Sequence, residues 1–286
     1  MRTRHAGAAT LAALTALTLA ACGGGEVGGG GGGGEETGGS GGGDTVKIGI
    51  KFDQPGLGYQ DGSEYTGFDT DVARYVAEKL GYSEDQIEWV EAPSANRETM
   101  LQTGQVDMIF ATYSITDERK EQVAFAGPYF IAGQDLLVAA DNTDITGPEA
   151  LKGKNLCSVT GSTSAQRIKD EYATDVQLVE RPGYAECVTA LTAGQVDAVT
   201  TDDIILAGLA AQPANKGKVK VVGNPFSEEN YGVGLPKDND TCEDINAAIQ
   251  SMIDDGSWEK AVKANTEGTG YEPNADLNPP TPAACA

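Results

Sequence analysis

The sequence Gly-Gln-Val-Asp occurs twice in this chain, starting at Gly104 and again at Gly194. Each copy follows a segment with helical spacing and precedes an apolar run that ends in polar residues. Glycine commonly ends a helix, and a short apolar run is typical of a buried strand. The chain therefore contains two equivalent helix–turn–strand units. Their polar ends are candidates for one shared site.

The segments around both units alternate between strand and helix patterns. We expect strands at 46–50, 87–90, 106–111, 156–160, 176–180 and 196–201. We expect one helix capped by Asp69 or Thr70 and another capped by Thr116, and helices at 96–102, 163–171, 184–193, 203–211, 242–255 and 257–263. This alternation predicts an α/β fold with mainly parallel sheets. The part of the chain that carries these patterns is about 240 residues long, which favours two lobes over a single core.

The N-terminus has the pattern of a secretion signal, expected over residues 1–22. Arg2 and Arg4 precede an apolar core too short to span a bilayer. The core ends in Leu-Ala-Ala-Cys, which resembles the bacterial lipobox, so we expect cleavage before Cys22 and a lipid on its thiol. An ordinary signal peptide with a chance cysteine is the alternative. The Gly-rich residues 23–43 predict a flexible tether with a root-mean-square length of roughly 25 Å. Together, the lipid and the tether place the protein, as an expectation, at the extracytoplasmic face of the cell membrane.

Charge and composition exclude several classes of function. The chain has 43 acidic and 20 basic residues, a net charge of −23, which argues against nucleic acid as a partner. The only histidine, His5, lies in the expected signal peptide. Histidine-dependent nucleophile systems and His-ligated zinc are therefore excluded from the mature protein, and we expect no catalytic residues, no metal and no cofactor.

Four cysteines remain once Cys22 is assigned to the lipid. An even number outside the cytoplasm predicts two disulfides, for which three connectivities are possible. Nearness in sequence favours Cys157–Cys187 and Cys242–Cys285. None of these cysteines has the CxxC spacing, which argues against a zinc or redox centre.

Several longer motifs carry a resemblance to a known family. They are GFDTDVARYVAEKLG (67–81), NRETMLQTGQVDMIFATYSITDERKEQVAFAGPYF (96–130), LKGKNLCSVTGSTSAQ (151–166), GQVDAVTTDD (194–203) and YGVGLPKDN (231–239). In this order they resemble the family 3 extracellular solute-binding proteins, the polar amino acid receptors of ABC importers, and above all the lipid-anchored glutamate-binding proteins of Gram-positive bacteria.

The resemblance implies a periplasmic-binding-protein-like type II fold. One lobe would comprise residues 44–130 and 233–286, and the other residues 134–229. Two segments near 131–133 and 230–232 would form the hinge. The expected partners are a free amino acid and the membrane permease subunits of an ABC importer, and we expect a monomer.

The resemblance also implies receivers for the backbone groups of an amino acid. Arg119 of the SITDER motif would bind the α-carboxylate, although a surface arginine paired with Glu118 or Glu121 is the alternative. The remaining expected contacts are Ser162 and Thr163 for the same carboxylate, Asp202 for the α-ammonium, and Thr112 and Ser114 for the ligand backbone. The neighbouring Asp203 suits the role of helix cap better.

Selectivity is expected to depend on three polar residues. Lys51 lies where the glutamate and aspartate receptors carry arginine, and Ser94 and Arg97 match a segment that holds the side-chain carboxylate. This set favours L-glutamate, with glutamine, aspartate and cystine as open alternatives.

Aromatic contacts and rival functions complete the expectations. Tyr184 stands at the family's usual site histidine, and Tyr59 or Tyr113 could stack on the ligand. A cyclohexadienyl-dehydratase-like enzyme and a sensor lipoprotein without transport are the rival functions.

Overall fold

The structure is a computed structural model that describes residues 45–285 except for 173–175. The expected signal peptide, the lipid-attachment residue Cys22 and the Gly-rich tether lie outside the described residues. Their assignments therefore stay predictions. Within the described part, no helix is both long enough and apolar enough to cross a membrane.

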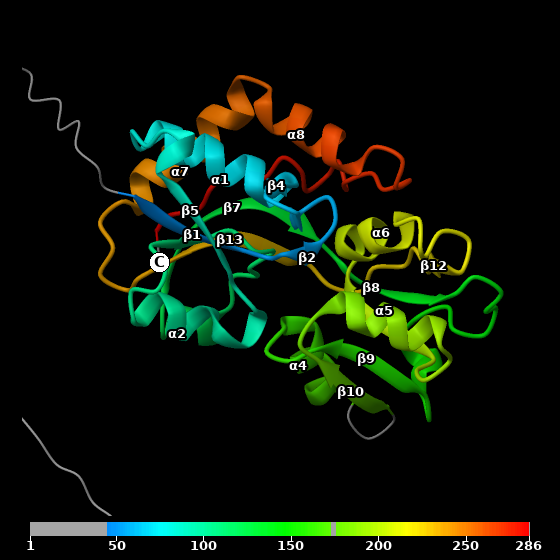
Figure 1. Ribbon diagram of the computed structural model, residues 1–286. Helices are drawn as coiled ribbons and strands as arrows, with labels where there is room; N and C mark the ends of the chain where they lie inside the picture. Colours follow the sequence, from blue (N-terminus) through cyan, green and yellow to red (C-terminus); the bar gives the residue numbers. More distant parts are fainter. Residues whose placement is uncertain (1–44, 173–175, 286) are drawn as a thin grey trace, which may run out of the picture. The chain divides into compact units, whose positions relative to one another are not determined.

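The first lobe is built on a five-stranded mixed sheet (Figure 1). Its strands, in spatial order, are β5 (Ile87–Glu91), β1 (Val46–Ile50), β6 (Met108–Ile109), β13 (Glu229–Leu235) and β7 (Ala124–Ala132). Its helices are α1 (Phe68–Lys79), α2 (Arg97–Gln102), α3 (Asp117–Lys120), α7 (Cys242–Asp254) and α8 (Ser257–Thr266). Helices α1, α7 and α8 pack against one another on the same side of this sheet.

The second lobe repeats this plan. Its strands, in spatial order, are β10 (Gln177–Arg181), β9 (Asn155–Val159), β11 (Ala198–Asp202), β8 (Gln134–Ala139) and β12 (Val219–Val221). Its helices are α4 (Thr163–Glu171), α5 (Tyr184–Thr192) and α6 (Asp203–Ala211). Short 3₁₀ turns lie at Glu84–Gln86, Ser94–Asn96 and Pro148–Leu151.

Each sheet contains one strand that runs against the others. In the first lobe β13 is antiparallel to both β6 and β7, and in the second lobe β8 is antiparallel to both β11 and β12. The remaining strands of each sheet share one direction, as an α/β fold predicts. The reversed strands follow the two crossings of the chain: a single residue, Gly133, separates β7 from β8, and β13 follows the return from β12.

The two Gly-Gln-Val-Asp segments are constructed alike. The glycine of each has a positive φ, 67° in the first and 70° in the second, which ends the preceding helix. Asp107 Oδ2 then accepts a hydrogen bond from the Lys47 N–H at 2.8 Å. Asp197 Oδ2 accepts one from the Asn155 N–H, also at 2.8 Å. In both lobes this aspartate joins the turn to the first residues of the adjacent parallel strand, so the repeat fixes equivalent strands.

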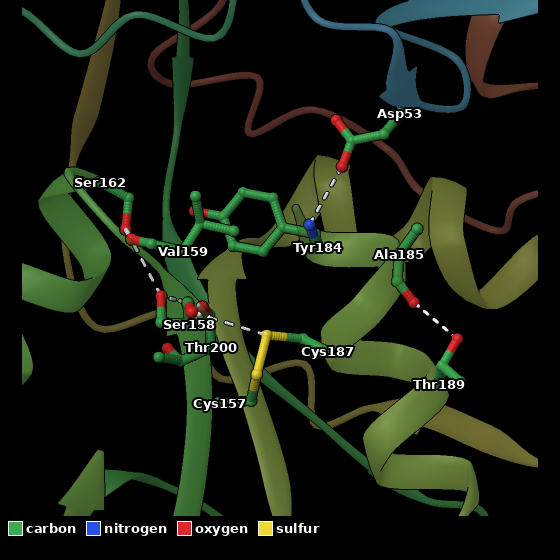
Figure 2. The surroundings of a disulfide bond; sticks show 10 residues. All are labelled: Asp53, Cys157, Ser158, Val159, Ser162, Tyr184, Ala185, Cys187, Thr189 and Thr200. Atoms are coloured by element: carbon green, nitrogen blue, oxygen red, sulfur yellow. Dashed lines mark hydrogen bonds between the residues drawn. A yellow bond between two sulfur atoms is a disulfide. The ribbon is translucent and has the colours of Figure 1, made fainter. Parts of the chain in front are cut away.

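Both expected disulfides are present. Cys157–Cys187 joins β9 to α5, and Cys242–Cys285 joins α7 to the C-terminal segment. Figure 2 shows that the first disulfide lies beside the segment that leads from β9 into α4. It therefore ties the strand that leads to Ser162 and Thr163 to the helix that begins at Tyr184.

The start of α1 differs from the prediction. The helix begins at Phe68, and its N-cap is Gly67, not Asp69 or Thr70. Gly67 has a φ of 119°, and a Cβ there would lie 1.9 Å from the Leu57 carbonyl oxygen, so a side chain is excluded. Asp69 is fully buried, and its carboxylate accepts hydrogen bonds from the Thr112 N–H and the Tyr129 hydroxyl instead of capping the helix.

A small three-stranded sheet was not expected from the sequence. It consists of β2 (Asp53–Gln54), β3 (Gly58–Asp61) and β4 (Glu64–Thr66). These strands are short and mostly polar, so they lack the alternation of apolar and polar residues that predicts a strand. They matter for function because β2 lies against the second lobe.

Candidate ligand-binding site

The ten residues expected to contact a ligand come from strand ends and helix starts. Nine of them are buried and Thr163 is half-buried. They follow β1, β5 and β6 in the first lobe, and they end β11 or begin α4 and α5 in the second. Ligand sites of α/β sheets lie at such carboxyl ends of strands.

Arg119 is held by both lobes. Thr116 caps the short helix α3 and accepts the Arg119 N–H at 3.2 Å, as the sequence predicts. The guanidinium donates to the carbonyl of Ser114 at 2.7 Å and to that of Gly161, in the second lobe, at 3.1 Å. Its ion-pair partner is Glu98, at 3.3 Å, and not the expected alternatives next to it in sequence.

Tyr113 lies against two arginines. The Arg97 guanidinium carbon is 4.2 Å from the centre of the Tyr113 ring, and that of Arg119 is 4.9 Å from it. The Tyr113 hydroxyl donates to Glu98 at 2.8 Å, and the ring is fully buried. Tyr113 thus packs against the cations that would receive a ligand. The other aromatic candidate, Tyr59, lies in β3 and is half-buried.

Lys51 and Arg97 are cations removed from water. The Lys51 ammonium donates to the Ser94 hydroxyl at 3.0 Å, and Arg97 donates to the Ala111 carbonyl at 2.8 Å. Burial, with a contribution from the neighbouring Arg97, lowers the pKa of Lys51 to about 8. Burial likewise lowers the pKa of Arg97 to about 10, with a contribution from Arg119. Buried cations that lower one another's pKa in this way are stabilised by a nearby anion.

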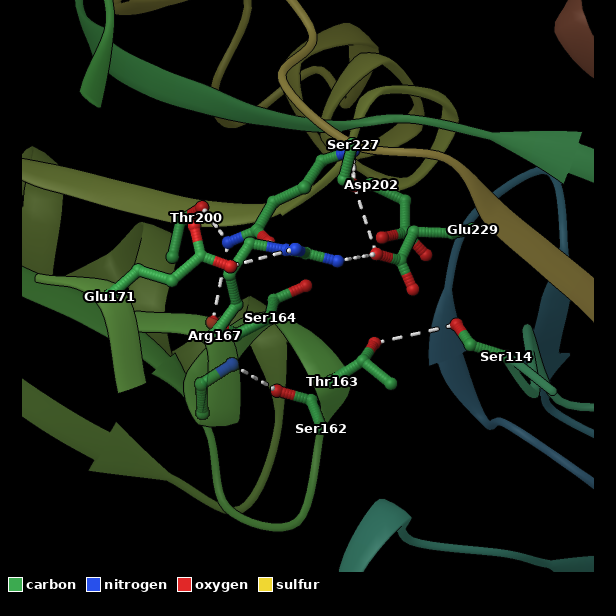
Figure 3. A network of polar contacts seen from close by, with 12 residues as sticks. Ser114, Ser162, Thr163, Ser164, Arg167, Glu171, Thr200, Asp202, Ser227 and Glu229 are labelled. Atoms are coloured by element: carbon green, nitrogen blue, oxygen red, sulfur yellow. Dashed lines mark hydrogen bonds and ion pairs between the residues drawn. The ribbon is translucent and has the colours of Figure 1, made fainter. Parts of the chain in front are cut away.

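Asp202 is the matching buried anion. Its Oδ2 accepts a hydrogen bond from the Tyr231 hydroxyl at 2.6 Å, whereas its Oδ1 has no partner among the described residues. Burial raises its pKa well above the ordinary value, and the nearby Glu229 raises it further. Figure 3 shows Asp202 beside Glu229. A carboxylate in these surroundings favours a cationic partner.

The cap of α6 is different from the expected one. Asp202 occupies the N-cap position without capping through its side chain, and Asp203 is the first helical residue. Asp203 Oδ1 accepts the N–H groups of Ile204 at 2.7 Å and Gly133 at 3.3 Å. Asp203 therefore holds the helix start to the crossing between β7 and β8, and Asp202 stays available.

Thr112 has an unusual backbone conformation. Its φ is 47°, the only positive value of a non-glycine residue in the described part of the chain. Its N–H donates to Asp69 Oδ2 at 2.9 Å, and its hydroxyl lies 2.7 Å from the Ala111 carbonyl. Both donors of Thr112 are therefore used within the protein. Such strain persists where the surroundings enforce it, often at functional sites.

Two further contacts cross between the lobes. The hydroxyls of Ser114 and Thr163 lie 3.4 Å apart (Figure 3). The Tyr184 N–H donates to Asp53 Oδ2 at 3.1 Å (Figure 2). Ser162, next to Thr163, caps α4 by accepting the Ala165 N–H at 3.0 Å. The expected residues of the two lobes are thus brought together.

The residues expected to hold an α-carboxylate border an open space. A cavity of about 580 Å³ is lined from the first lobe by Arg119 and from the second by Gly161, Ser162 and Thr163. Lys51 and Asp202 do not line it. Of the ten expected residues, only Arg119, Ser162 and Thr163 line this cavity.

Sequence reasoning missed several residues that shape this site. They are Gln54, Asp69, Glu98, Tyr231 and Glu229. Glu98 and Asp69 lie within the quoted motifs NRET and GFDTD, which was the available signal. Tyr231 and Glu229 reach the site only because β13 returns beside β7.

Buried cations and a buried carboxylate lie where the two lobes meet. This arrangement is typical of a receptor that encloses a small ionic solute. Comparison with known proteins agrees with this class. Residues 46–266 match the bacterial extracellular solute-binding proteins, family 3. The chain belongs to this family, and it is therefore a solute receptor and not an enzyme.

The similarity extends over most of the chain. The chain is 46% identical over 277 residues to the glutamate-binding protein GluB of Corynebacterium efficiens, and the match covers 93% of this chain and 91% of that protein. It is 37% identical over 223 residues to the ABC transporter glutamine-binding protein GlnH of Bacillus subtilis, covering 77% and 80%. The structure of an ancestral arginine-binding protein bound to glutamine matches with a TM-score of 0.71 at 36% identity, covering 77% of this chain and 96% of that one. The two-lobe type II fold is thus confirmed.

Proposed function

We propose that this protein captures L-glutamate as the amino acid-binding receptor of an ABC importer. Glutamate carries two carboxylates and one ammonium. The observation that supports the proposal is the matching set of buried charges: the cations Lys51, Arg97 and Arg119 against Asp202 with its free oxygen. Arg119 pairs with Glu98 and would receive the α-carboxylate of any amino acid, whereas a neutral ligand side chain would leave Lys51 and Arg97 without an anion from the ligand.

Each end of the ligand has its own receivers in this proposal. Arg119 and the N–H groups at the start of α4 bind the α-carboxylate, since a guanidinium and a helix N-terminus both favour anions. Asp202 Oδ1 accepts the α-ammonium. Lys51, Ser94 and Arg97 hold the side-chain carboxylate.

The other expected residues act around these groups. Ser114 presents its carbonyl to Arg119 and its hydroxyl to Thr163, so it joins the lobes near the α-carboxylate. Thr112 contributes through its strained backbone, and Tyr184 closes the site from the second lobe.

Capture depends on a hinge. We retain the proposed boundaries: residues 44–130 and 233–286 form one lobe, 134–229 form the other, and 131–133 and 230–232 form the hinge. Ligand contacts on both lobes favour the closed arrangement and exclude water. Cys22 would carry the lipid that keeps this receptor at the outer face of the membrane, next to the permease subunits.

Calorimetric titration with single amino acids tests the proposal. The purified protein is titrated with L-glutamate, L-glutamine, L-aspartate and L-cystine. We expect glutamate to bind at least about tenfold more tightly than glutamine, because one buried charge pair distinguishes them. Tight binding of glutamine with none of glutamate would overturn the assignment of Lys51 and Arg97.

A further inference from the structure

Buried polar atoms without partners are rare, and here they gather in one place. Nearly all buried side-chain polar groups in proteins form hydrogen bonds. Within residues 45–285, apart from the three that are not described, only Gln54 Nε2, Arg97 Nε and Asp202 Oδ1 are buried without a partner. Arg97 and Asp202 already belong to the proposed ligand site. Gln54 has no assigned role.

Gln54 lies where the two lobes touch. It ends β2, and its neighbours on both sides contact the second lobe. Asp53 accepts the Tyr184 N–H (Figure 2), and a Cβ on Gly208 of α6 would lie 2.1 Å from the Pro55 carbonyl oxygen. Gln54 itself is 1% exposed. Its side chain is therefore enclosed at the interface that a ligand would share.

The carboxamide of Gln54 has a defined orientation. Its oxygen accepts from the Thr112 hydroxyl at 3.2 Å, whose single proton it shares with the Ala111 carbonyl. Its amide nitrogen has no partner, so the donor is the part of the group left for a ligand. A ligand carboxylate accepts from such a donor more strongly than the neutral oxygen of a ligand amide does, because the bond is charge-assisted.

The backbone of Lys51 is tied to the same small sheet. Gln54 pairs with Gly58 in the β2–β3 ladder, and a Cβ on Gly58 would lie 2.7 Å from the Lys51 carbonyl oxygen. Only glycine permits this contact, which holds Lys51 and Gln54 in a fixed relation. The donor of Gln54 is thus positioned by the element that also positions the proposed side-chain receiver.

Building on the proposed function, we propose that Gln54 contacts the ligand and sets specificity by donating its amide N–H to the side-chain carboxylate of the bound amino acid. In this proposal the neutral donor of Gln54 acts on the same ligand carboxylate as the cation Lys51. The contact favours an acidic side chain over the corresponding amide.

Two substitutions of similar size test this role by calorimetry with L-glutamate and L-glutamine. Gln54→Met removes the donors, and we expect about a tenfold loss of glutamate affinity with a smaller change for glutamine. Gln54→Glu replaces the donors with a carboxylate, and we expect a larger loss for glutamate than in Gln54→Met. Glutamine affinity should then rise relative to glutamate, because its amide can donate to the new acid.

A matched control is Gln60→Glu, in the neighbouring strand β3, where the side chain donates to the Tyr65 hydroxyl. It should leave the preference for glutamate over glutamine unchanged. Unchanged glutamate affinity in both Gln54 variants, or tighter glutamate binding by Gln54→Glu, would overturn the proposal. If Gln54→Glu fails to fold, Gln54→Met still decides.

This test is separable from that of the proposed function. Should the unmodified protein bind another amino acid in place of glutamate, the proposed ligand is wrong. Gln54→Met is then titrated with the amino acid that does bind. A loss of affinity supports Gln54 as a ligand contact, and unchanged affinity refutes it.

Discussion

Asp69 and Thr112 show how single residues shape this site. Asp69 accepts the Tyr129 hydroxyl at 2.8 Å through one oxygen and the Thr112 N–H at 2.9 Å through the other. These bonds hold Thr112 in its left-handed conformation at the end of the first-lobe strand. The chain beyond Thr112 then presents the Ser114 carbonyl to Arg119. One buried carboxylate thereby organises the segment that leads to the α-carboxylate receiver.

Asp202→Asn should separate binding from stability. The side-chain oxygen of Asn can still accept from Tyr231, but the charge for the ligand ammonium is lost. We expect glutamate affinity to fall by about 2–5 kcal/mol, measured by calorimetry. Burial disfavours the charge of Asp202, as its raised pKa indicates. The ligand-free variant should therefore melt at the same temperature as the unmodified protein or higher at pH 7.5.

The neighbouring residue provides the control. The three hydrogen bonds from Gly133, Ile204 and Tyr271 all reach the same Asp203 oxygen, so Asp203→Asn can keep them. We expect its glutamate affinity to change by no more than about threefold. Equal losses in Asp202→Asn and Asp203→Asn would contradict the assignment of the ammonium to Asp202.

At the scale of elements, α4 connects the ligand site to both crossings of the chain. Its N-terminus contributes Ser162 and Thr163 to the site. One turn further on, Arg167 donates to Gln134, at the start of β8, at 3.0 Å. The same guanidinium pairs with Glu229, at the start of β13, at 3.1 Å (Figure 3). Arg167 therefore joins the helix to the two strands through which the chain crosses between the lobes.

Arg167→Met should loosen this junction. Methionine keeps an apolar stem but leaves the buried Glu229 carboxylate without its cation, which we expect to lower the free energy of unfolding by about 1–3 kcal/mol in urea titration. The double variant with Glu229→Gln should recover part of this loss, because it removes the unpaired charge.

Lys169→Met is the control in the same helix. Both members of the Lys169–Glu180 pair are partly exposed, and neither is buried as Glu229 is, so we expect a change below about 0.5 kcal/mol. If Arg167→Met and Lys169→Met cost the same, the junction has no special role.

For the whole molecule, acidity sets the dependence of stability on pH. Burial raises the pKa of Asp69 and of Asp203 to about 6, and it raises that of Asp202 well above the ordinary value. As the pH falls, the folded protein takes up these protons before the unfolded chain does. By linkage, the free energy of unfolding therefore rises as the pH falls from about 6 to about 4. The net charge of −23 adds repulsion that also declines in this range.

We therefore expect the ligand-free protein to melt at a higher temperature at pH 5.5 than at pH 7.5, measured by calorimetry. The gain in melting temperature from saturating glutamate should shrink over the same interval, because the ammonium binds the ionised form of Asp202. A ligand-free melting temperature that falls steadily from pH 7.5 to pH 5.5 would contradict these pKa directions. A constant gain from ligand would argue against Asp202 as the ammonium receiver.

The sequence by itself determined the features that depend on local pattern. The expected helices at 163–171 and 203–211 coincide with α4 and α6, and the two Gly-Gln-Val-Asp turns marked the equivalent strands. The strand expected at 106–111 is reduced to Met108–Ile109, because ladder pairing and not apolar character decides its length.

Only the tertiary structure decided which polar groups meet. Tyr231 reaches Asp202 through the course of β13, and Glu98 reaches Arg119 through that of α2, while β2 leaves the amide nitrogen of Gln54 without a partner between the lobes. These residues lie 21 to 29 positions apart where they bond, so no local spacing relates them. Helix periods and turn residues act over a few positions, whereas burial and partner choice arise when the sheets assemble.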